Sequence, residues 1–104
     1  MTIFWSSFAI ATLQEVYEFN KVKSVNTKAA NRLVHAIVQF VTKLEKHPYI
    51  GQVEHFLSDR PEGFRYIVYK NYKIIYWVNV PLDRIEISYV FDSRQRPSTL
   101  GRLK

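Results

Sequence analysis

The residues best suited to chemistry in this chain are arginines near its C-terminal end. The segment FDSRQRP, residues 91–97, places Arg94 and Arg96 after the last hydrophobic run, and Arg102 and Lys104 follow without an acidic residue. The planar guanidinium group forms two parallel hydrogen bonds to a carboxylate or a phosphate, which the ammonium group of lysine cannot copy. This ending therefore predicts a surface that binds a negatively charged group. The alternative is a tail that only improves solubility.

The charge of the chain is distributed unevenly along the sequence. The 104 residues carry a formal net charge of +6. Residues 1–63 contain seven Lys/Arg against six Asp/Glu, a balance of +1, whereas residues 64–104 contain eight against three, a balance of +5. A positive surface favours polyanions or an acidic protein partner and accelerates encounter with them. The sequence thus assigns the basic character to the second half of the chain.

The chain contains no cysteine, which excludes disulfides, thiolate metal ligands and cysteine nucleophiles. A reducing cytoplasm is consistent with this composition. The histidines His35, His47 and His55 show no spacing with carboxylates that is typical of a metal site. We therefore expect neither a metal nor another cofactor.

The first 19 residues are apolar but are not typical of an export signal or a membrane anchor. They lack the basic start of a signal peptide, and Gln14, Glu15 and Glu18 interrupt them long before membrane-spanning length. A length of 104 residues fits one domain with one core. We therefore expect a single cytoplasmic domain over residues 1–104 with no contact to a membrane.

Two amphipathic helices are predicted in the first half of the chain. Ser6 or Ser7 can cap the first helix, and Asn26 or Thr27 can cap the second. Pro48 ends the second helix, because a proline inside a helix costs about 3 kcal/mol or more. The apolar residues at helical spacing are Ala9, Leu13, Val16 and Tyr17 in the first helix and Ala30, Leu33, Ile37, Phe40, Val41 and Leu44 in the second. This pattern predicts a helical hairpin.

From residue 64 onward the apolar pattern has the period of a β-strand. Residues 64–69, 72–79 and 85–91 alternate, and Lys70-Asn71 fits a tight turn because Asn tolerates the left-handed conformation. The predicted strand faces are Tyr72, Ile74, Tyr76 and Val78 on one strand and Ile85, Ile87, Tyr89 and Phe91 on the next. With a short strand over residues 2–5, these segments predict a small antiparallel sheet whose Tyr72, Ile74 and Tyr76 face packs under the helices. The expected fold class is α+β, with the order β-α-α-β-β-β.

The order of these elements and several motifs resemble the RelE/ParE toxins of bacterial type II toxin–antitoxin systems. The segment FWSSFAIATLQEVYEF, residues 4–19, is similar to the family's first strand and helix, and HPYIG, residues 47–51, is similar to the loop after its second helix. Arg65 and NYKIIYWV resemble the Tyr-rich hairpin, and RIEISYVFDSRQRP resembles the last strand with its basic end. Each motif is weak alone, but together they cover nearly the whole chain in the family's order.

The resemblance implies a toxin of a plasmid-stabilisation module, which inhibits growth and is neutralised by a small cognate antitoxin. ParE-type members poison DNA gyrase without cutting nucleic acid, whereas RelE-type members are ribosome-dependent mRNA endoribonucleases. The loop HPYIG, the single strand-opening Arg65 and the short ending after RQRP are more similar to ParE-type members. The resemblance therefore favours gyrase as the target, with the ribosome and its mRNA as the alternative, and implies contact with operator DNA only through the antitoxin complex.

The resemblance also implies roles for individual basic residues. If the chain is a ribonuclease, the catalytic candidates are Arg65, Lys73 and Arg94. RNA cleavage needs a base, an acid for the leaving oxygen and cations for the phosphate, yet no Tyr or His follows Arg94, where ribonuclease members carry an acid. For target binding, the candidates are Lys73, Arg94, Arg96 and Arg102.

Structural roles are the alternative for two of these residues. Arg65 can pair with Asp92 or Glu86 across the sheet. Lys73 should lie on the strand face opposite Ile74, where it can be a solvated surface lysine. For the whole protein, the alternative is a non-toxic basic module that only docks nucleic acid or an acidic partner.

Overall fold

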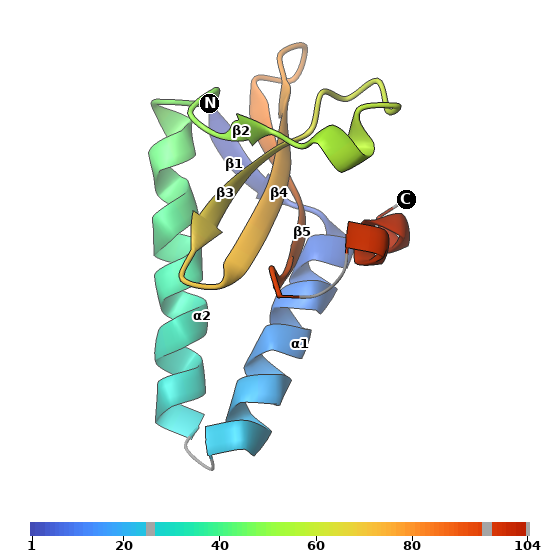
Figure 1. Ribbon diagram of the computed structural model, residues 1–104. Coiled ribbons are helices and arrows are strands. Elements are labelled where there is room, and N and C mark those ends of the chain that lie inside the picture. Colours follow the sequence, from blue (N-terminus) through green and yellow to red (C-terminus); the bar gives the residue numbers. More distant parts are fainter. Residues whose placement is uncertain (25–26, 95–96, 104) are drawn as a thin grey trace.

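The computed structural model describes residues 1–24, 27–94 and 97–103, which form a helical hairpin packed on a five-stranded sheet (Figure 1). The two long helices are α1 (Ser7–Ser24) and α2 (Thr27–Val41). The strands are β1 (Thr2–Trp5), β2 (Gln52–Val53), β3 (Arg65–Tyr69), β4 (Tyr72–Asn79) and β5 (Arg84–Asp92). Three short 3-10 helices complete the described chain: η1 (Thr42–Glu45), η2 (His55–Leu57) and η3 (Pro97–Arg102). The predicted α+β class is confirmed.

Local sequence signals explain where the helices begin and end. The Ser6 hydroxyl accepts a hydrogen bond from the Ala9 amide at 3.0 Å, which confirms Ser6 as the residue that caps α1. Helix α2 begins at Thr27, while the alternative cap Asn26 lies outside the described residues. The helical path continues through η1 and stops before Pro48, as predicted.

The sheet is mixed, which corrects the prediction of a purely antiparallel sheet. Its strand order is β1-β5-β4-β3-β2, and β1 pairs with β5 in parallel, with Thr2 opposite Arg84 and Trp5 opposite Ile87. The helical hairpin returns the chain to the end of the sheet where it started, so β1 and β3 run in the same direction. Two further reversals leave β5 in that direction too. β5 is the last strand of the meander, and β1 pairs with its open edge.

Strand β2 is a second difference from the prediction, which placed strands only at residues 2–5, 64–69, 72–79 and 85–91. Gln52 pairs with Tyr66 and Val53 pairs with Arg65 in antiparallel register. Two residues are too few to show the alternation by which a strand is predicted. This short strand fixes the loop after η1 against the edge of β3.

A β-bulge in β5 overturns the predicted face of that strand. Ile75 of β4 lies opposite Tyr89, whereas the next residue, Tyr76, lies opposite Ile87, so Ser88 is an extra residue. The extra residue reverses the alternation: Ile87 belongs to the helix-side core, and Tyr89 belongs to the core on the other face. The turn between β3 and β4 also differs in detail, since the left-handed conformation falls on Lys70, with φ of 53°.

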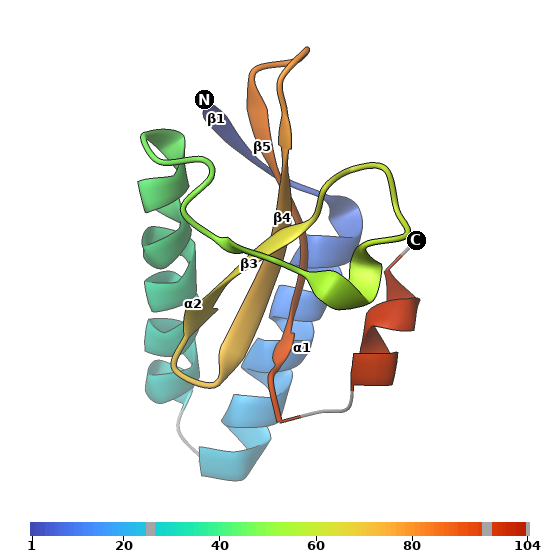
Figure 2. The ribbon, with the colours of Figure 1, turned by 45° about the horizontal axis from the view of Figure 1, so that its top comes forward.

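Both faces of the sheet are covered, each by its own hydrophobic core (Figure 2). The helix-side core contains the predicted residues of α1, α2 and β4: Ala9, Val16, Ile37, Leu44, Tyr72, Ile74 and Tyr76 are buried, and Leu13, Leu33 and Phe40 pack at its margin. On the opposite face, Leu57 of η2 and Leu100 and Leu103 of the C-terminal segment pack on Ile75, Tyr89 and Phe91. The predicted helix-side core is confirmed, and the second core was not predicted.

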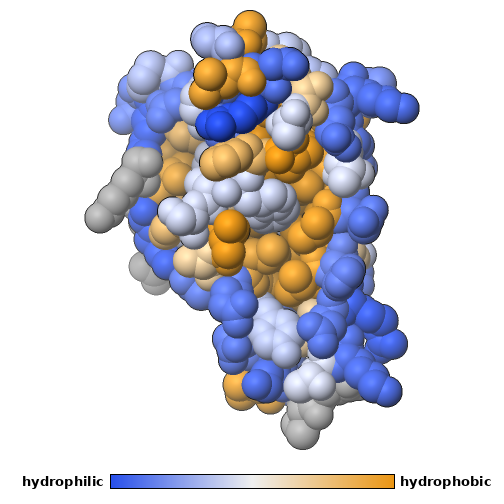
Figure 3. Space-filling view, turned by 180° about the vertical axis from the view of Figure 1, so that it is seen from behind, coloured by the Kyte–Doolittle hydropathy of each residue, from blue (hydrophilic) through white to orange (hydrophobic). Residues whose placement is uncertain are grey.

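The surface of the back of the molecule is divided into an apolar middle and hydrophilic margins (Figure 3). Phe4 of β1 and Ile10 of α1 are among the exposed apolar residues. No helix in the described ranges is long and apolar enough to cross a membrane.

Candidate functional site

The arginine that follows β5 is bound to the last residue of that strand. Arg94 Nε lies 2.9 Å from Asp92 Oδ1, and the Arg94 amide donates to the same oxygen at 2.9 Å. The hydrogen bond from the Arg94 guanidinium lowers the pKa of Asp92 to about 2. The Arg94 side chain remains 62% exposed. Arg94 is therefore oriented by Asp92 while its guanidinium stays accessible to a partner.

This ion pair predicts a specific pH dependence of stability. The pKa of Asp92 falls from 3.8 to about 2 in the folded state, so the carboxylate contributes stability that is complete above pH 3.8 and is lost as the pH falls toward 2. We expect Asp92→Asn to melt below the wild type near neutral pH, and we expect the two melting temperatures to converge as the pH falls from about 4 to about 2. Thermal unfolding over this range provides the measurement. A gap that stays constant down to pH 2 would contradict the assignment.

Arg102 joins the C-terminal segment to the first helix. Its two terminal nitrogens donate to the two carboxylate oxygens of Glu15 on α1, at 3.1 and 2.9 Å. The hydrogen bond from Arg102 lowers the pKa of Glu15. Leu100 and Leu103 are buried on either side of this arginine.

The C-terminal segment around Arg102 is thus a packed part of the fold, which argues against the alternative of a tail that only improves solubility. Two covered leucines and one bidentate ion pair hold η3 against the sheet and α1. The predicted target-binding residue Arg96 lies outside the described residues, as does Lys104.

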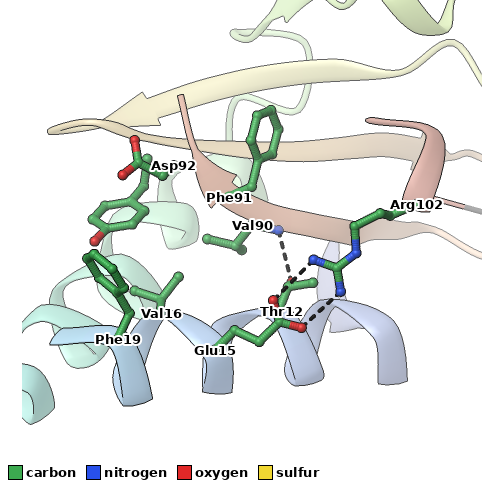
Figure 4. Close-up of a pocket in the computed structure, with 9 residues that line it drawn as sticks. Thr12, Glu15, Val16, Phe19, Val90, Phe91, Asp92 and Arg102 are labelled. Carbon is green, nitrogen blue, oxygen red and sulfur yellow. Dashed lines mark hydrogen bonds and ion pairs between the residues drawn. The ribbon is translucent and has the colours of Figure 1, made fainter. Parts of the chain in front are cut away.

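A surface groove of 330 Å³ lies between α1 and the end of β5 (Figure 4). Its apolar lining includes Val16 and Phe19 from α1 and Val90 and Phe91 from β5. Phe19 is 56% exposed. Arg102, paired with Glu15, and Asp92, paired with Arg94, contribute charges to the same groove. The groove offers an apolar floor with charged groups beside it.

Thr12 holds the two walls of this groove together. Its hydroxyl donates to the Ala9 carbonyl at 2.9 Å and accepts a hydrogen bond from the Val90 amide at 3.1 Å (Figure 4). Strand β1 pairs with β5 only as far as Ile87, so beyond that point a side chain replaces the neighbouring strand as the partner of the β5 backbone. The Val90 amide, which has no strand partner on this side, is satisfied by this hydroxyl.

Lys73 lies on the other side of β4 from the helices, as predicted, but it is not a solvated surface lysine. Its ammonium nitrogen lies 2.6 Å from a carboxylate oxygen of Glu54 and 3.9 Å from the centre of the Tyr66 ring. The Glu54 side chain is 2% exposed and the Lys73 side chain 19%. Sequence reasoning missed Glu54, because a single acid in an irregular loop carries no periodic signal.

Arg65 supports a loop instead of pairing with a carboxylate. It donates to the carbonyl oxygen of Gly51 at 2.9 Å and to that of Tyr49 at 3.4 Å. The expected partners are engaged elsewhere: Glu86 binds Arg84 and Asn79, and Asp92 binds Arg94. The prediction of an Arg65 ion pair with Asp92 or Glu86 is wrong, because the loop that β2 ties to β3 supplies closer acceptors.

Tyr76 of β4 also holds the loop that contains Pro48 and Gly51. Its hydroxyl donates to the Pro48 carbonyl at 2.8 Å and accepts from the Gly51 amide at 2.9 Å. Burial raises the pKa of this phenol, so it is neutral and able to donate at physiological pH. The loop motif HPYIG is therefore held by Tyr76 and Arg65 together.

The fold does not gather the candidate cations into one centre. Arg94 and Arg102 belong to the groove and its margin through their carboxylate partners, Lys73 is paired on the opposite side of the sheet, and Arg65 supports the loop. Across residues 1–24, 27–94 and 97–103, no three His, Asp or Glu side chains form a group that could hold a metal ion. The arrangement is suited to binding a partner with apolar and charged groups.

Comparisons with known proteins agree with this architecture. Residues 3–97 match the model of a family described as the ParE toxin of the type II toxin-antitoxin system parDE. Nine chains of solved structures match the chain. One of them, described as the chromosomal ParDE TA system from P. aeruginosa, superposes with a TM-score of 0.72 over 88% of this chain and 95% of that chain, at 21% sequence identity. At this identity the superposition shows a common fold. No curated protein matches the chain.

Proposed function

Because this chain belongs to the ParE toxin family of type II toxin–antitoxin systems, we propose that it inhibits DNA gyrase in the cytoplasm and that a cognate antitoxin neutralises it. The family model covers residues 3–97, which is nearly the entire chain. The finer proposal, gyrase inhibition without cleavage of nucleic acid, rests on how the candidate catalytic residues are engaged.

The observation that carries this proposal is the pair formed by Lys73 and Glu54. A ribonuclease of this architecture needs an accessible cation on the sheet to stabilise the phosphate in the transition state. Here a buried carboxylate neutralises that cation at 2.6 Å. The same sheet face is covered by the C-terminal segment through Leu100 and Leu103. These features favour a ParE-type inhibitor over a RelE-type ribonuclease.

The groove between α1 and β5 supports the proposed antitoxin contact. Its apolar floor, with Val16 and the exposed Phe19, suits the apolar side chains of an antitoxin segment. Acidic side chains of that segment can share Arg102 with Glu15, because a guanidinium group has five N–H donors and Glu15 accepts from its two terminal nitrogens. An antitoxin segment that is both apolar and acidic would thus cover the groove.

Expression and target assays test this function. We expect the chain alone to arrest growth, and we expect coexpression with the acidic product of the adjacent gene to restore growth and yield a stable complex. Toxin separated from this complex should inhibit supercoiling by purified gyrase and should leave mRNA on translating ribosomes intact. Codon-specific mRNA cleavage with unaffected supercoiling would replace the proposal by the RelE-type activity.

A double variant of the basic ending serves as the residue-level control. Arg94→Ala with Arg96→Ala should relieve growth arrest and gyrase inhibition, because both residues are proposed to contact the target. The melting temperature should fall by no more than it does in Asp92→Asn, because both changes remove the same surface ion pair, which contributes about 0–1 kcal/mol. The paired variant Arg94→Lys with Arg96→Lys keeps the charge and tests whether the planar guanidinium group is required. Full toxicity of the alanine double variant would remove these arginines from the target-binding surface.

A further inference from the structure

Four of the eight cations in the second half of the chain are paired with carboxylates of the fold itself. Four ion pairs involve this half: Lys73 with Glu54, Arg84 with Glu86, Arg94 with Asp92, and Arg102 with Glu15. Two of the acids, Glu15 and Glu54, come from the first half of the chain. Tertiary contacts therefore draw negative charge toward the second half and away from the first.

A second concentration of positive charge lies on the helical hairpin. Residues 20–47 contain six Lys/Arg against the single acid Glu45, a balance of +5. Five of these cations are exposed and have no carboxylate within ion-pair distance in the part of the chain that the structure describes: Lys21, Lys23, Arg32, Lys43 and Lys46. We call these five residues the hairpin cations. They extend from the tip of the hairpin, at the end of α1, along α2 to η1 (Figure 1).

Helix stability does not account for all of these positions. Lys43 and Lys46 follow the C-terminal end of α2, where the helix dipole favours positive charge. Lys21 and Lys23 lie in the last turn of α1, where the dipole likewise favours positive charge. Arg32 is the sixth residue of α2 and lies beyond its first turn, so the helix dipole does not account for its position.

The residues that lie between the hairpin cations indicate what kind of partner this surface could bind. The apolar residues of α2 that contact the core are buried, among them Ala30 and Ile37, while Asn31, His35 and Gln39 are exposed between the cations. Viewed from behind, hydrophilic side chains follow the edge of the molecule that α2 forms (Figure 3). A protein interface requires an apolar centre, whereas a phosphate backbone requires only positive and polar groups.

We propose that the hairpin cations bind the phosphate backbone of duplex DNA without reading its sequence. Arg32 and Lys46 are separated by 14 residues along a nearly continuous helical path, which corresponds to about 20 Å at 1.5 Å per residue. This span exceeds the width of the DNA major groove, about 12 Å, so the cations can contact phosphates on both sides of the groove. The inference goes beyond gyrase inhibition, because it assigns to the toxin a contact with DNA that requires neither gyrase nor antitoxin.

Binding of a short labelled duplex to the purified full chain, measured by fluorescence anisotropy between about 50 and 200 mM salt, tests this proposal. The logarithm of the association constant should fall linearly with the logarithm of the salt concentration, by about 0.9 for each phosphate neutralised. The triple variant Lys23→Gln, Arg32→Gln and Lys46→Gln should bind at least about tenfold more weakly at low salt and should lose about one unit of this slope per residue.

A charge-matched variant decides whether the location of the charge matters. Ser58→Glu, Arg60→Gln and Lys70→Gln lower the net charge by the same three units outside the helical hairpin and should leave affinity and slope close to those of the wild type. Equal losses in both triple variants at unchanged melting temperatures would overturn the proposal, as would absence of binding by the wild type. Tighter binding of polyglutamate than of the duplex would assign the hairpin to an acidic protein and likewise overturn it. A wild type that binds DNA but leaves gyrase active would refute the proposed function and not this inference.

Discussion

Replacing Gly51 by alanine is expected to destabilise the fold by about 3–5 kcal/mol, which combines overpacking with the loss of buried hydrogen bonds. A Cβ atom at this position would lie 2.6 Å from the Tyr76 hydroxyl oxygen and 2.7 Å from the carbonyl oxygen of Tyr66. Neither neighbour can move easily, because Tyr76 is fully buried and the Tyr66 backbone is paired within the sheet. The loop would have to leave its site and break the bonds that Tyr76 makes to Gly51 and Pro48. Chemical denaturation measures the change.

The chain contains a matched control for this substitution. An added Cβ at Gly101 would meet no atom within 4 Å, so Gly101→Ala should change stability by less than about 0.5 kcal/mol. Tyr76→Phe removes only the hydroxyl group and should cost about 1–3 kcal/mol, because it leaves the partners of that hydroxyl without a hydrogen bond. If Gly51→Ala unfolds at the same denaturant concentration as Gly101→Ala, the loop is not held as described.

Truncation of Ile37 to alanine should cost about 2–5 kcal/mol, a large part of the stability of a domain of this size. Ile37 is 0% exposed in the helix-side core, where α2 packs against β4 and β5. Its removal leaves a cavity between two rigid layers, which cannot close by the movement of one side chain. Denaturant unfolding followed by circular dichroism measures the loss. Cooperative unfolding at an unchanged midpoint would show that the core has been misplaced.

The neighbouring residue Val38 provides the control on the same helix. Its side chain is 36% exposed, so Val38→Ala should remain within about 0.5 kcal/mol of the wild type. A similar loss in both variants would indicate a general effect on helix α2. Phe40 lies at the margin of the core, where its ring is 5.2 Å from that of Tyr69 between centroids. We therefore expect truncation of Phe40 to cost less free energy of unfolding than truncation of a fully buried aromatic residue.

These sites differ in how far the sequence could have predicted them. The importance of Ile37 follows from helical periodicity alone, because one face of α2 must be apolar to cover a sheet. The steric role of Gly51 does not follow from its position in HPYIG. It depends on the approach of Tyr76, which is 25 residues away in the chain. Glycine in a loop predicts a turn, whereas here it provides room for a side chain from the sheet.

Local periodicity in the sequence determined the elements and most of the core. The Ser6 cap, the apolar stripes of both helices and the alternating face of β4 are properties of neighbouring residues, and the structure confirms each of them. The order of motifs likewise identified the family before any distance was known. These features are readable because the period of a helix or a strand is imposed within a few residues.

Only the tertiary structure decided the direction of β1, the bulge at Ser88 and the partners of the charged residues. Glu54 and Lys73 are 19 residues apart in the sequence, and Glu15 and Arg102 are 87 apart. The sequence placed the excess charge in the second half, yet these pairs bring two acids of the first half to it. Five exposed cations without an ion pair among the described residues lie on the helical hairpin instead. Net charge can be counted along a chain, but which charge a partner meets depends on the pairs that folding brings within contact distance.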